Sequence, residues 1–155
     1  TVGAAGTIIT WGYVFAAATQ LRNQIKNKSI PLNFVCHDNQ WHVLAKATSV
    51  AGITLAQVPE RLVGAQGWYI GTVPGANINV YTSTNVPVDS SGDAIGAMFT
   101  RDAIALDWRR NVRIEPERDA SRRGWELNMS AVYAHGIWRP ELGVKMTFDA
   151  QAPTS

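Results

Sequence analysis

An alternation of side chains near the end of the chain constrains its fold more than any other feature. Between Trp125 and Ile137 the odd positions carry Trp, Leu, Met, Ala, Tyr, His and Ile. The first intervening positions are polar, namely Glu126, Asn128 and Ser130. A period of two indicates a β-strand with one buried face. The later intervening positions are also apolar, which predicts that the second half of this strand is covered on both sides.

A second strand is predicted directly after this one. Pro140 fixes φ and Gly143 accepts positive φ, so residues 139–143 are expected to form a turn. Beyond the turn, Val144, Met146 and Phe148 alternate with polar residues. We therefore predict that the strand at 125–137 returns as an antiparallel hairpin partner at 144–149.

Composition limits the classes of protein that fit. The chain has 155 residues, 46% hydrophobic and 17% charged, which suits one ordered globular domain. A net charge of +2 favours neither nucleic acid nor a membrane, and a single cysteine excludes an internal disulfide. The first charged residue is Arg22, so the 21 residues before it carry no charge. Several Thr and Gly residues lower the hydrophobicity of this stretch, which excludes a membrane span. No basic region precedes it, which excludes a secretory signal. Because the chain begins with Thr1, we expect it to be the carboxy-terminal part of a longer polypeptide.

The rest of the pattern predicts a mixed α+β domain. Thr10 can cap a helix with Val14, Ala18 and Leu21 on one face, and Asp38 can cap a second helix. Strands are expected at 32–36, 68–73, 76–82, 94–99 and 111–117, a loop at 85–93, and a charged connector at 118–123. Short helices are expected at 60–63 and from 100 to 108.

Catalytic candidates are few. Cys36, His37 and His42 could suggest a metal site or a nucleophile, but zinc needs four ligands, usually in paired spacings, and a Cys/His nucleophile needs a third orienting group. We interpret them as a buried thiol and two imidazoles at a helix start. The prediction is therefore no catalytic residue, no metal and no cofactor, with a small Cys/His hydrolase as an alternative.

Arginines are concentrated in one stretch of the chain. Seven of the fourteen basic residues lie between residues 101 and 123, all of them arginines, and acidic residues lie among them. Arginine forms forked pairs with carboxylates, whereas a nucleic-acid patch carries few acids. The pattern favours ion-pair networks within or between subunits; a plain solvated face and a nucleic-acid-binding module are alternatives. The candidate inter-subunit contacts are Arg101, Arg109, Arg110, Arg113, Glu115, Glu117, Arg118, Asp119, Arg122 and Arg123.

Several motifs, in order, resemble tailed-bacteriophage major capsid proteins. They are VCHDNQW at 35–41, INVYTSTNVP at 78–87, AIGAMFTRDAIAL at 94–106, VRIE at 112–115, ERDA at 117–120, and VYAHGI at 132–137 followed by RPE at 139–141. The resemblance covers most of the chain from residue 10 to residue 148. It implies the α+β Hong Kong 97-like capsid fold, with an axial domain over 10–107 and return strands of the peripheral domain over 108–155.

The resemblance also implies a function. It implies a non-enzymatic subunit of an icosahedral virion shell, assembled in the host cytoplasm around double-stranded DNA. Expected partners are copies of the chain in hexamers and pentamers, scaffolding, portal or decoration proteins, and packaged DNA through nonspecific contacts, with no membrane. An encapsulin-like compartment shell is the alternative. The family's amino-terminal arm, extended loop and spine helix have no counterpart in this sequence.

Overall fold

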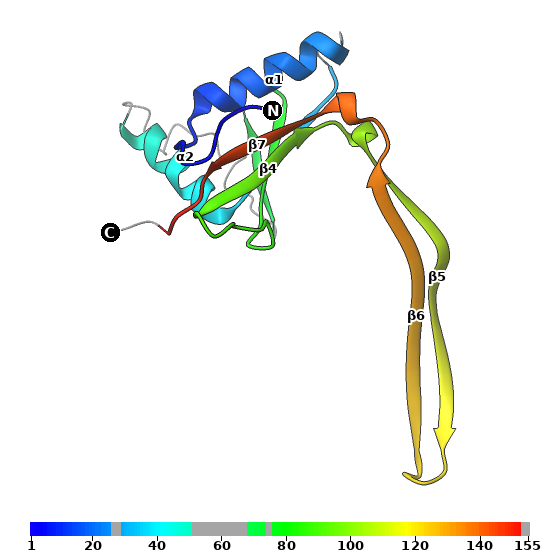
Figure 1. Cartoon of the computed structure of the whole chain (residues 1–155). Helices are drawn as coiled ribbons and strands as arrows, with labels where there is room; N and C mark the ends of the chain where they lie inside the picture. Colours follow the sequence, from blue (N-terminus) through cyan, green and yellow to red (C-terminus); the bar gives the residue numbers. More distant parts are fainter. Residues whose placement is uncertain (26–28, 51–67, 74–75, 153–155) are drawn as a thin grey trace. The chain divides into compact units, whose positions relative to one another are not determined.

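The structure is a computed structural model, and it describes residues 1–25, 29–50, 68–73 and 76–152. The chain divides into two compact units (Figure 1). Unit 1 comprises Thr1–Ala103 and Arg139–Ser155, and unit 2 comprises Ile104–Trp138. The short helix expected at 60–63 lies outside the described residues.

Unit 1 is built on a five-stranded sheet in the order β2-β3-β1-β4-β7. Its central strand β1 (Leu32–Cys36) runs parallel to β3 (Ile78–Thr82) and antiparallel to β4 (Asp93–Phe99). The outer strands β2 (Tyr69–Val73) and β7 (Gly143–Asp149) run antiparallel to β3 and β4, respectively. The predicted α+β class is confirmed.

Helix α1 (Trp11–Ile25) follows Thr10, whose carbonyl accepts hydrogen bonds from the first turn. Its buried residues Val14, Ala18 and Leu21 recur at the predicted helical spacing. Together with Leu44 of α2 (Asp38–Val50) they join one core with the sheet. None of the helices within the described ranges is long and apolar enough to cross a membrane.

Helix α2 is capped by His37, where the sequence suggested Asp38. The His37 Nδ1 accepts a hydrogen bond from the Asn39 N–H at 3.2 Å. In return, the Gln40 Oε1 accepts one from the His37 N–H at 3.2 Å. This reciprocal pair satisfies two backbone donors, as a capping box does, and leaves Asp38 in the first turn, where a negative charge suits the helix dipole.

The sheet buries alternate residues against the helices. On β1, Leu32, Phe34 and Cys36 are fully buried, while Asn33 and Val35 are half-buried on the opposite face. Strands β3 and β7 follow the same alternation. The hydrophobic core of unit 1 therefore lies on the helix-covered face of the sheet.

The predicted hairpin at the end of the chain is wrong in its pairing. Strand β7 pairs with β4, from Phe99↔Gly143 to Asp93↔Asp149, because Val144, Met146 and Phe148 complete the core of unit 1. The short 3₁₀ helix η4 (Pro140–Leu142) precedes β7 in place of a hairpin turn.

The helix expected from 100 to 108 is also wrong. Only a 3₁₀ turn, η3 (Arg101–Ala103), forms there, and an extended strand starts at Ile104. Within unit 1, the Arg139 N–H donates to the Ala103 carbonyl at 3.3 Å. The points where the chain leaves and re-enters unit 1 are therefore joined by a hydrogen bond.

Candidate assembly interface

Unit 2 is a two-stranded antiparallel ribbon. Strand β5 (Ile104–Asp119) pairs with β6 (Gly124–Ile137), from Ile104↔Ile137 to Asp119↔Gly124, with irregularities on either side of Arg110. The strands predicted at 111–117 and 125–137 are confirmed, and the first is longer than expected. The alternation of Ile104, Leu106 and Trp108 is the signal that the helix interpretation missed.

The turn at the tip of the ribbon is held by one carboxylate. The Asp119 Oδ1 accepts hydrogen bonds from the Ser121 hydroxyl at 2.6 Å, the Ser121 N–H at 2.9 Å and the Arg122 N–H at 3.3 Å. These bonds, led by the Ser121 hydroxyl, hold the pKa of Asp119 below its usual value. Arg123 closes the turn with a left-handed φ of 50°. The predicted connector at 118–123 is thus mostly strand end and tight turn.

One side of the ribbon is apolar. Cross-strand partners lie on the same side, so Ile114 lies with Met129 and Pro116 with Leu127. Trp108 also packs on Tyr133, with ring centroids 5.1 Å apart. The exposed apolar residues of this side are Ile104, Leu106, Trp108, Ile114, Trp125, Leu127, Met129, Tyr133 and Ile137.

This apolar side has no cover within the described chain. Trp125, Leu127 and Met129 are 70%, 67% and 72% exposed, and the second half of β6, expected to be covered on both sides, is exposed as well. Two-stranded ribbons are marginally stable by themselves, and large exposed apolar patches mark interaction sites. Unit 2 therefore has the character of an interface element.

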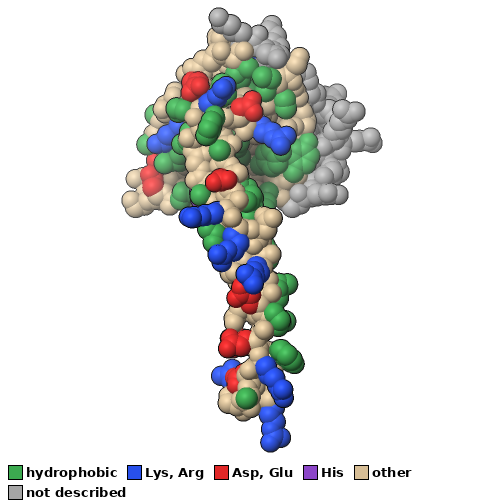
Figure 2. Space-filling model, turned by 90° about the vertical axis from the view of Figure 1, so that its right-hand side faces the viewer, with side chains coloured by type: hydrophobic (Ala, Val, Ile, Leu, Met, Phe, Trp, Pro, Cys, Tyr) green, Lys and Arg blue, Asp and Glu red, His purple; other side chains and the backbone are tan. Residues whose placement is uncertain are grey.

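The other side of the ribbon is charged. It carries the cross-strand pairs Arg110↔Val132, Arg113↔Ser130, Glu115↔Asn128 and Glu117↔Glu126. Arg113 and Glu115 form an ion pair at 3.1 Å between side chains that are 67% and 55% exposed. Figure 2 shows apolar, basic and acidic side chains at the surface of this ribbon. The ribbon is consequently amphipathic, with both of its sides accessible.

Nine of the ten candidate contact residues lie in unit 2, and Arg101 lies in η3 of unit 1. Ion pairs join Arg113 to Glu115 and Arg122 to Asp119. The remaining six form no ion pair with any described residue: Arg101, Arg109, Arg110, Glu117, Arg118 and Arg123. Their role as inter-subunit contacts stays a prediction.

The Cys/His group has a structural role. Cys36 points into the core, and its thiol donates to the Tyr81 carbonyl at 3.9 Å. Burial, with a smaller contribution from the negative charge of Asp38, raises the pKa of the Cys36 thiol to about 12. A cysteine nucleophile needs the opposite shift. His37 caps α2, and His42 is exposed on that helix.

We expect the Cys36 thiol to be unreactive in the folded protein at pH 8 and fully reactive after denaturation. Because its pKa is raised on folding, the neutral thiol stabilises the folded state below the ordinary pKa of 9.0, and this contribution is lost as the pH rises towards about 12. Titration with a thiol reagent, with and without denaturant, measures this. Rapid labelling of the native chain would contradict the assignment and reopen the hydrolase hypothesis.

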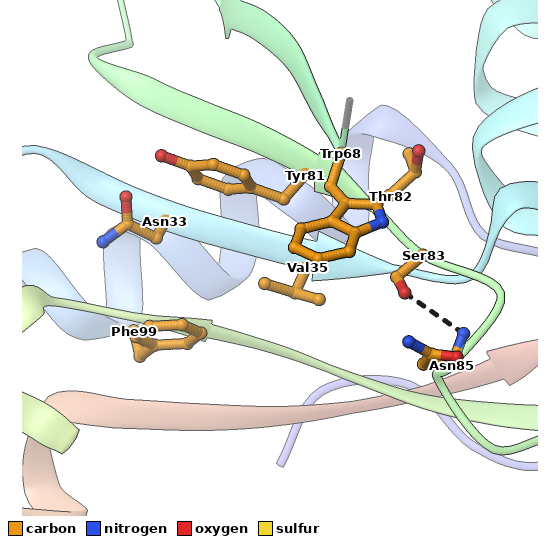
Figure 3. A pocket seen from close by; sticks show the side chains of 8 residues that line it. All are labelled: Asn33, Val35, Trp68, Tyr81, Thr82, Ser83, Asn85 and Phe99. Atoms are coloured by element: carbon orange, nitrogen blue, oxygen red, sulfur yellow. Dashed lines mark hydrogen bonds between the residues drawn. The ribbon is translucent and has the colours of Figure 1, made fainter. Parts of the chain in front are cut away.

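A recess of about 440 Å³ lies on the sheet face opposite the helices (Figure 3). Val35 and Phe99 line it together with the aromatic rings of Tyr81 and Trp68. At its rim the Asn85 N–H donates to the Ser83 hydroxyl oxygen at 3.1 Å. This recess could not be predicted from the sequence, because its residues come from separate strands and from the segments next to them.

Comparisons with known proteins were made at the levels of sequence and structure. No protein-family model and no curated protein sequence matches the chain. Solved structures do match, and several of them share 11–16% sequence identity with this chain.

Among the matched structures is the capsid of Ralstonia phage GP4, with a TM-score of 0.70 and 11% identity over 100% of this chain and 52% of that one. The capsid structure of cyanophage P-SCSP1u matches with a TM-score of 0.61 and 16% identity, over 90% of this chain and 45% of that one. The holo-SrpI encapsulin complex from Synechococcus elongatus PCC 7942 matches with a TM-score of 0.56 and 11% identity, over 99% of this chain and 55% of that one. The chain spans about half the length of the chains it matches. Its fold is the fold of phage capsid proteins.

Proposed function

We propose that this chain forms part of a major capsid protein of the Hong Kong 97-like type, a non-enzymatic subunit of an icosahedral phage shell. The observation that carries the proposal is the match of 90–100% of the chain to phage capsid structures. In the proposed arrangement, residues 10–107 act as the axial region and residues 108–155 as the return strands of the peripheral region. The whole protein would reside in the virion after assembly in the host cytoplasm.

The amphipathic ribbon of unit 2 supports this proposal. A shell subunit must present broad surfaces to several neighbours, and interface cores are rich in aromatic residues and arginine. Unit 2 exposes Trp108, Trp125 and Tyr133 on its apolar side. It also carries exposed arginines and acids on the opposite side. A closed shell uses the same contact many times, so modest surfaces suffice for stable assembly.

Partners other than copies of the chain belong to the proposal as well. Hexamers and pentamers of the whole protein would form the shell. Scaffolding, portal or decoration proteins and packaged double-stranded DNA would be further partners. Contacts with DNA would be nonspecific and therefore weakened by salt.

An encapsulin-like compartment shell is the second candidate, because the SrpI encapsulin shares the fold. The TM-score of 0.70 for the GP4 capsid, against 0.56 for SrpI, favours the phage assignment. Electron microscopy and light scattering of the native protein would show closed particles in both cases. Double-stranded DNA inside those particles would support the phage function, and protein cargo without DNA would support a compartment. A monomeric native protein would contradict both.

Arg109→Ala and Arg113→Ala are expected to impair assembly more than subunit stability. Arg113 pairs with Glu115 at an exposed position, and such ion pairs contribute about 0–1 kcal/mol to the free energy of unfolding. Particle yield and melting temperature of the two variants measure the two effects. An unchanged particle yield with a lowered melting temperature would contradict the prediction.

A further inference from the structure

Three aromatic rings surround the recess on the sheet face of unit 1 that lies opposite the helices. The rings of Trp68, Tyr81 and Phe99 are arranged around Val35 (Figure 3). Trp68 is 69% exposed, and its carbonyl accepts a hydrogen bond from the Thr82 N–H at 2.8 Å, which keeps the start of β2 beside the end of β3. The volume of about 440 Å³ is within the range of small-molecule sites, about 300–1,000 Å³. The recess therefore offers flat apolar surfaces on which a ring-shaped ligand can stack.

Polar groups around the recess are available to a ligand. The indole N–H of Trp68, the hydroxyl of Tyr81 and the side-chain amide of Asn85 form no hydrogen bond with a described residue. The Ser83 hydroxyl oxygen accepts a bond from the Asn85 N–H at 3.1 Å, and its own hydrogen remains available for donation. Amides and hydroxyls both donate and accept hydrogen bonds. The recess can therefore bind a ligand whose polar groups also do both.

A chain of hydrogen bonds orients one further amide in advance. The hydroxyl oxygens of Tyr69 and Thr72 are 2.8 Å apart, and the Thr72 hydroxyl donates to the Asn79 Oδ1 at 2.8 Å. The Asn79 Nδ2 in turn donates to the Oδ1 of Asn33, which lines the recess, at 3.3 Å. The Asn33 Nδ2 forms no hydrogen bond with a described residue. Because the Asn33 side chain is already held in place, its contact with a ligand costs little conformational entropy.

The charge of the recess restricts the class of ligand. None of the described residues that line it is charged, so a phosphate or carboxylate group would have no counter-ion there. A purely apolar ligand would leave the surrounding amides and hydroxyls buried without partners, which is unfavourable. A neutral sugar avoids both problems. Its C–H face can stack on an aromatic ring, and its hydroxyl groups both donate and accept, as the side chains around the recess do.

We propose that this recess binds a neutral hexose unit of an oligosaccharide. The sugar ring stacks on Trp68, and its hydroxyl groups bond to the amides of Asn33 and Asn85. This inference goes beyond the proposed function, because a shell subunit needs no small ligand in order to assemble. A proline-rich peptide, which also docks on aromatic grooves, is a poorer occupant. Its backbone carbonyls only accept hydrogen bonds and would leave the Asn85 Oδ1 without a donor.

Saturation-transfer difference NMR with the complete native polypeptide tests this binding, because it works for subunits and for large assemblies. The probes are the neutral trisaccharides cellotriose, maltotriose, mannotriose and galactotriose. Trigalacturonic acid is the charged counterpart of galactotriose. We expect at least one neutral trisaccharide to bind with a dissociation constant on the order of 1 mM, because stacking and neutral hydrogen bonds are its only contacts. Trigalacturonic acid should give no signal.

Variants connect the signal to the recess. Trp68→Ala is expected to weaken binding about tenfold, because a stacked ring contributes roughly this factor for other flat ligands. Trp68→Phe keeps an aromatic ring and should weaken binding less than about threefold. Asn85→Ala should also weaken binding.

Matched controls are Phe15→Ala and Asn23→Ala, which remove an exposed ring and an exposed amide from α1. Both should bind as the unaltered protein does. Melting curves of every variant show that it is folded.

The outcomes separate this inference from the proposed function. Binding of none of the four neutral trisaccharides would overturn it, and so would equal binding by a folded Trp68→Ala variant. A hexaproline peptide that binds through Trp68 while no sugar does would also overturn it and would identify a peptide groove. None of these results affects the shell function, because particle formation is measured separately. An unaltered polypeptide that forms no particle would refute the shell function and leave the sugar measurement valid.

Discussion

Replacing Phe34 by alanine is expected to lower the free energy of unfolding by about 3–5 kcal/mol. Phe34 is fully buried in β1, the central strand of the sheet. Its neighbours in register are Val80 on β3 and Met98 on β4, both fully buried. The substitution removes apolar area from the centre of the core and leaves a cavity that strands on both sides of β1 cannot close. Urea denaturation followed by circular dichroism measures the change.

Phe15→Ala is the matched control for this prediction. Phe15 lies on α1 with 44% of its surface exposed, and its ring contacts Trp11 at a centroid distance of 6.2 Å. The substitution removes the ring contact with Trp11 and leaves no internal cavity. We therefore expect the free energy of unfolding to fall by less than about 1 kcal/mol. Equal losses for the two variants would show that Phe34 does not lie at the centre of the core.

Replacing Gln40 by leucine is expected to lower the free energy of unfolding by about 3–4 kcal/mol, because buried polar groups left without partners cost about 1–3 kcal/mol each. The Gln40 side chain is buried, and its Nε2 donates to the carbonyls of Ala94 at 3.2 Å and Phe148 at 2.9 Å. Its Oε1 accepts the capping bond from the His37 N–H. One amide thus connects the start of α2 to β4 and β7, and leucine can form none of these bonds.

The control for Gln40 is Gln20→Leu, the same substitution at an exposed position of α1. It should change the free energy of unfolding by less than about 0.5 kcal/mol. Hydrogen exchange gives a second measurement, because the amide protons of the first turn of α2 should exchange faster in the Gln40 variant. A Gln40→Leu protein as stable as its control would contradict the proposed role of this side chain.

Local alternation allowed most elements of unit 1 to be predicted. Strand β1 lies at 32–36 as expected, and β4 starts one residue earlier than predicted, at Asp93. Helix α1 follows from the spacing of Val14, Ala18 and Leu21. Each of these elements has one face in the core, so apolar residues recur along its sequence with the period of a helix or a strand. The capping of α2 by His37 was missed because histidine is an uncommon N-cap residue.

Strand pairing could not be predicted in the same way. The pattern at 125–137 indicates a strand but does not specify its partner, and the nearest strand in sequence, β7, is needed in the core of unit 1. The partner β5 was obscured because Ile104, Leu106 and Trp108 were assigned to a helix. Pairing depends on which apolar faces meet over long sequence distances, and a local window does not contain that information.

The candidate interface could be predicted in part. The arginine and acid content pointed to residues 101–123, and nine of the ten candidates lie on one ribbon. The continuous apolar side of the ribbon was missed because it depends on the register of both strands. Compositional bias located the segment, and only the pairing revealed its two sides.

A cryo-electron microscopy reconstruction of the native assembly tests the central claim most directly. We predict a closed shell in which each subunit contains both units of this chain, with the apolar and charged sides of β5 and β6 buried at contacts. Buried Trp125, Leu127 and Met129 would account for their exposure in the single chain. A small, open oligomer whose ribbon remains in solvent on both sides would contradict the assignment of this chain to a capsid shell.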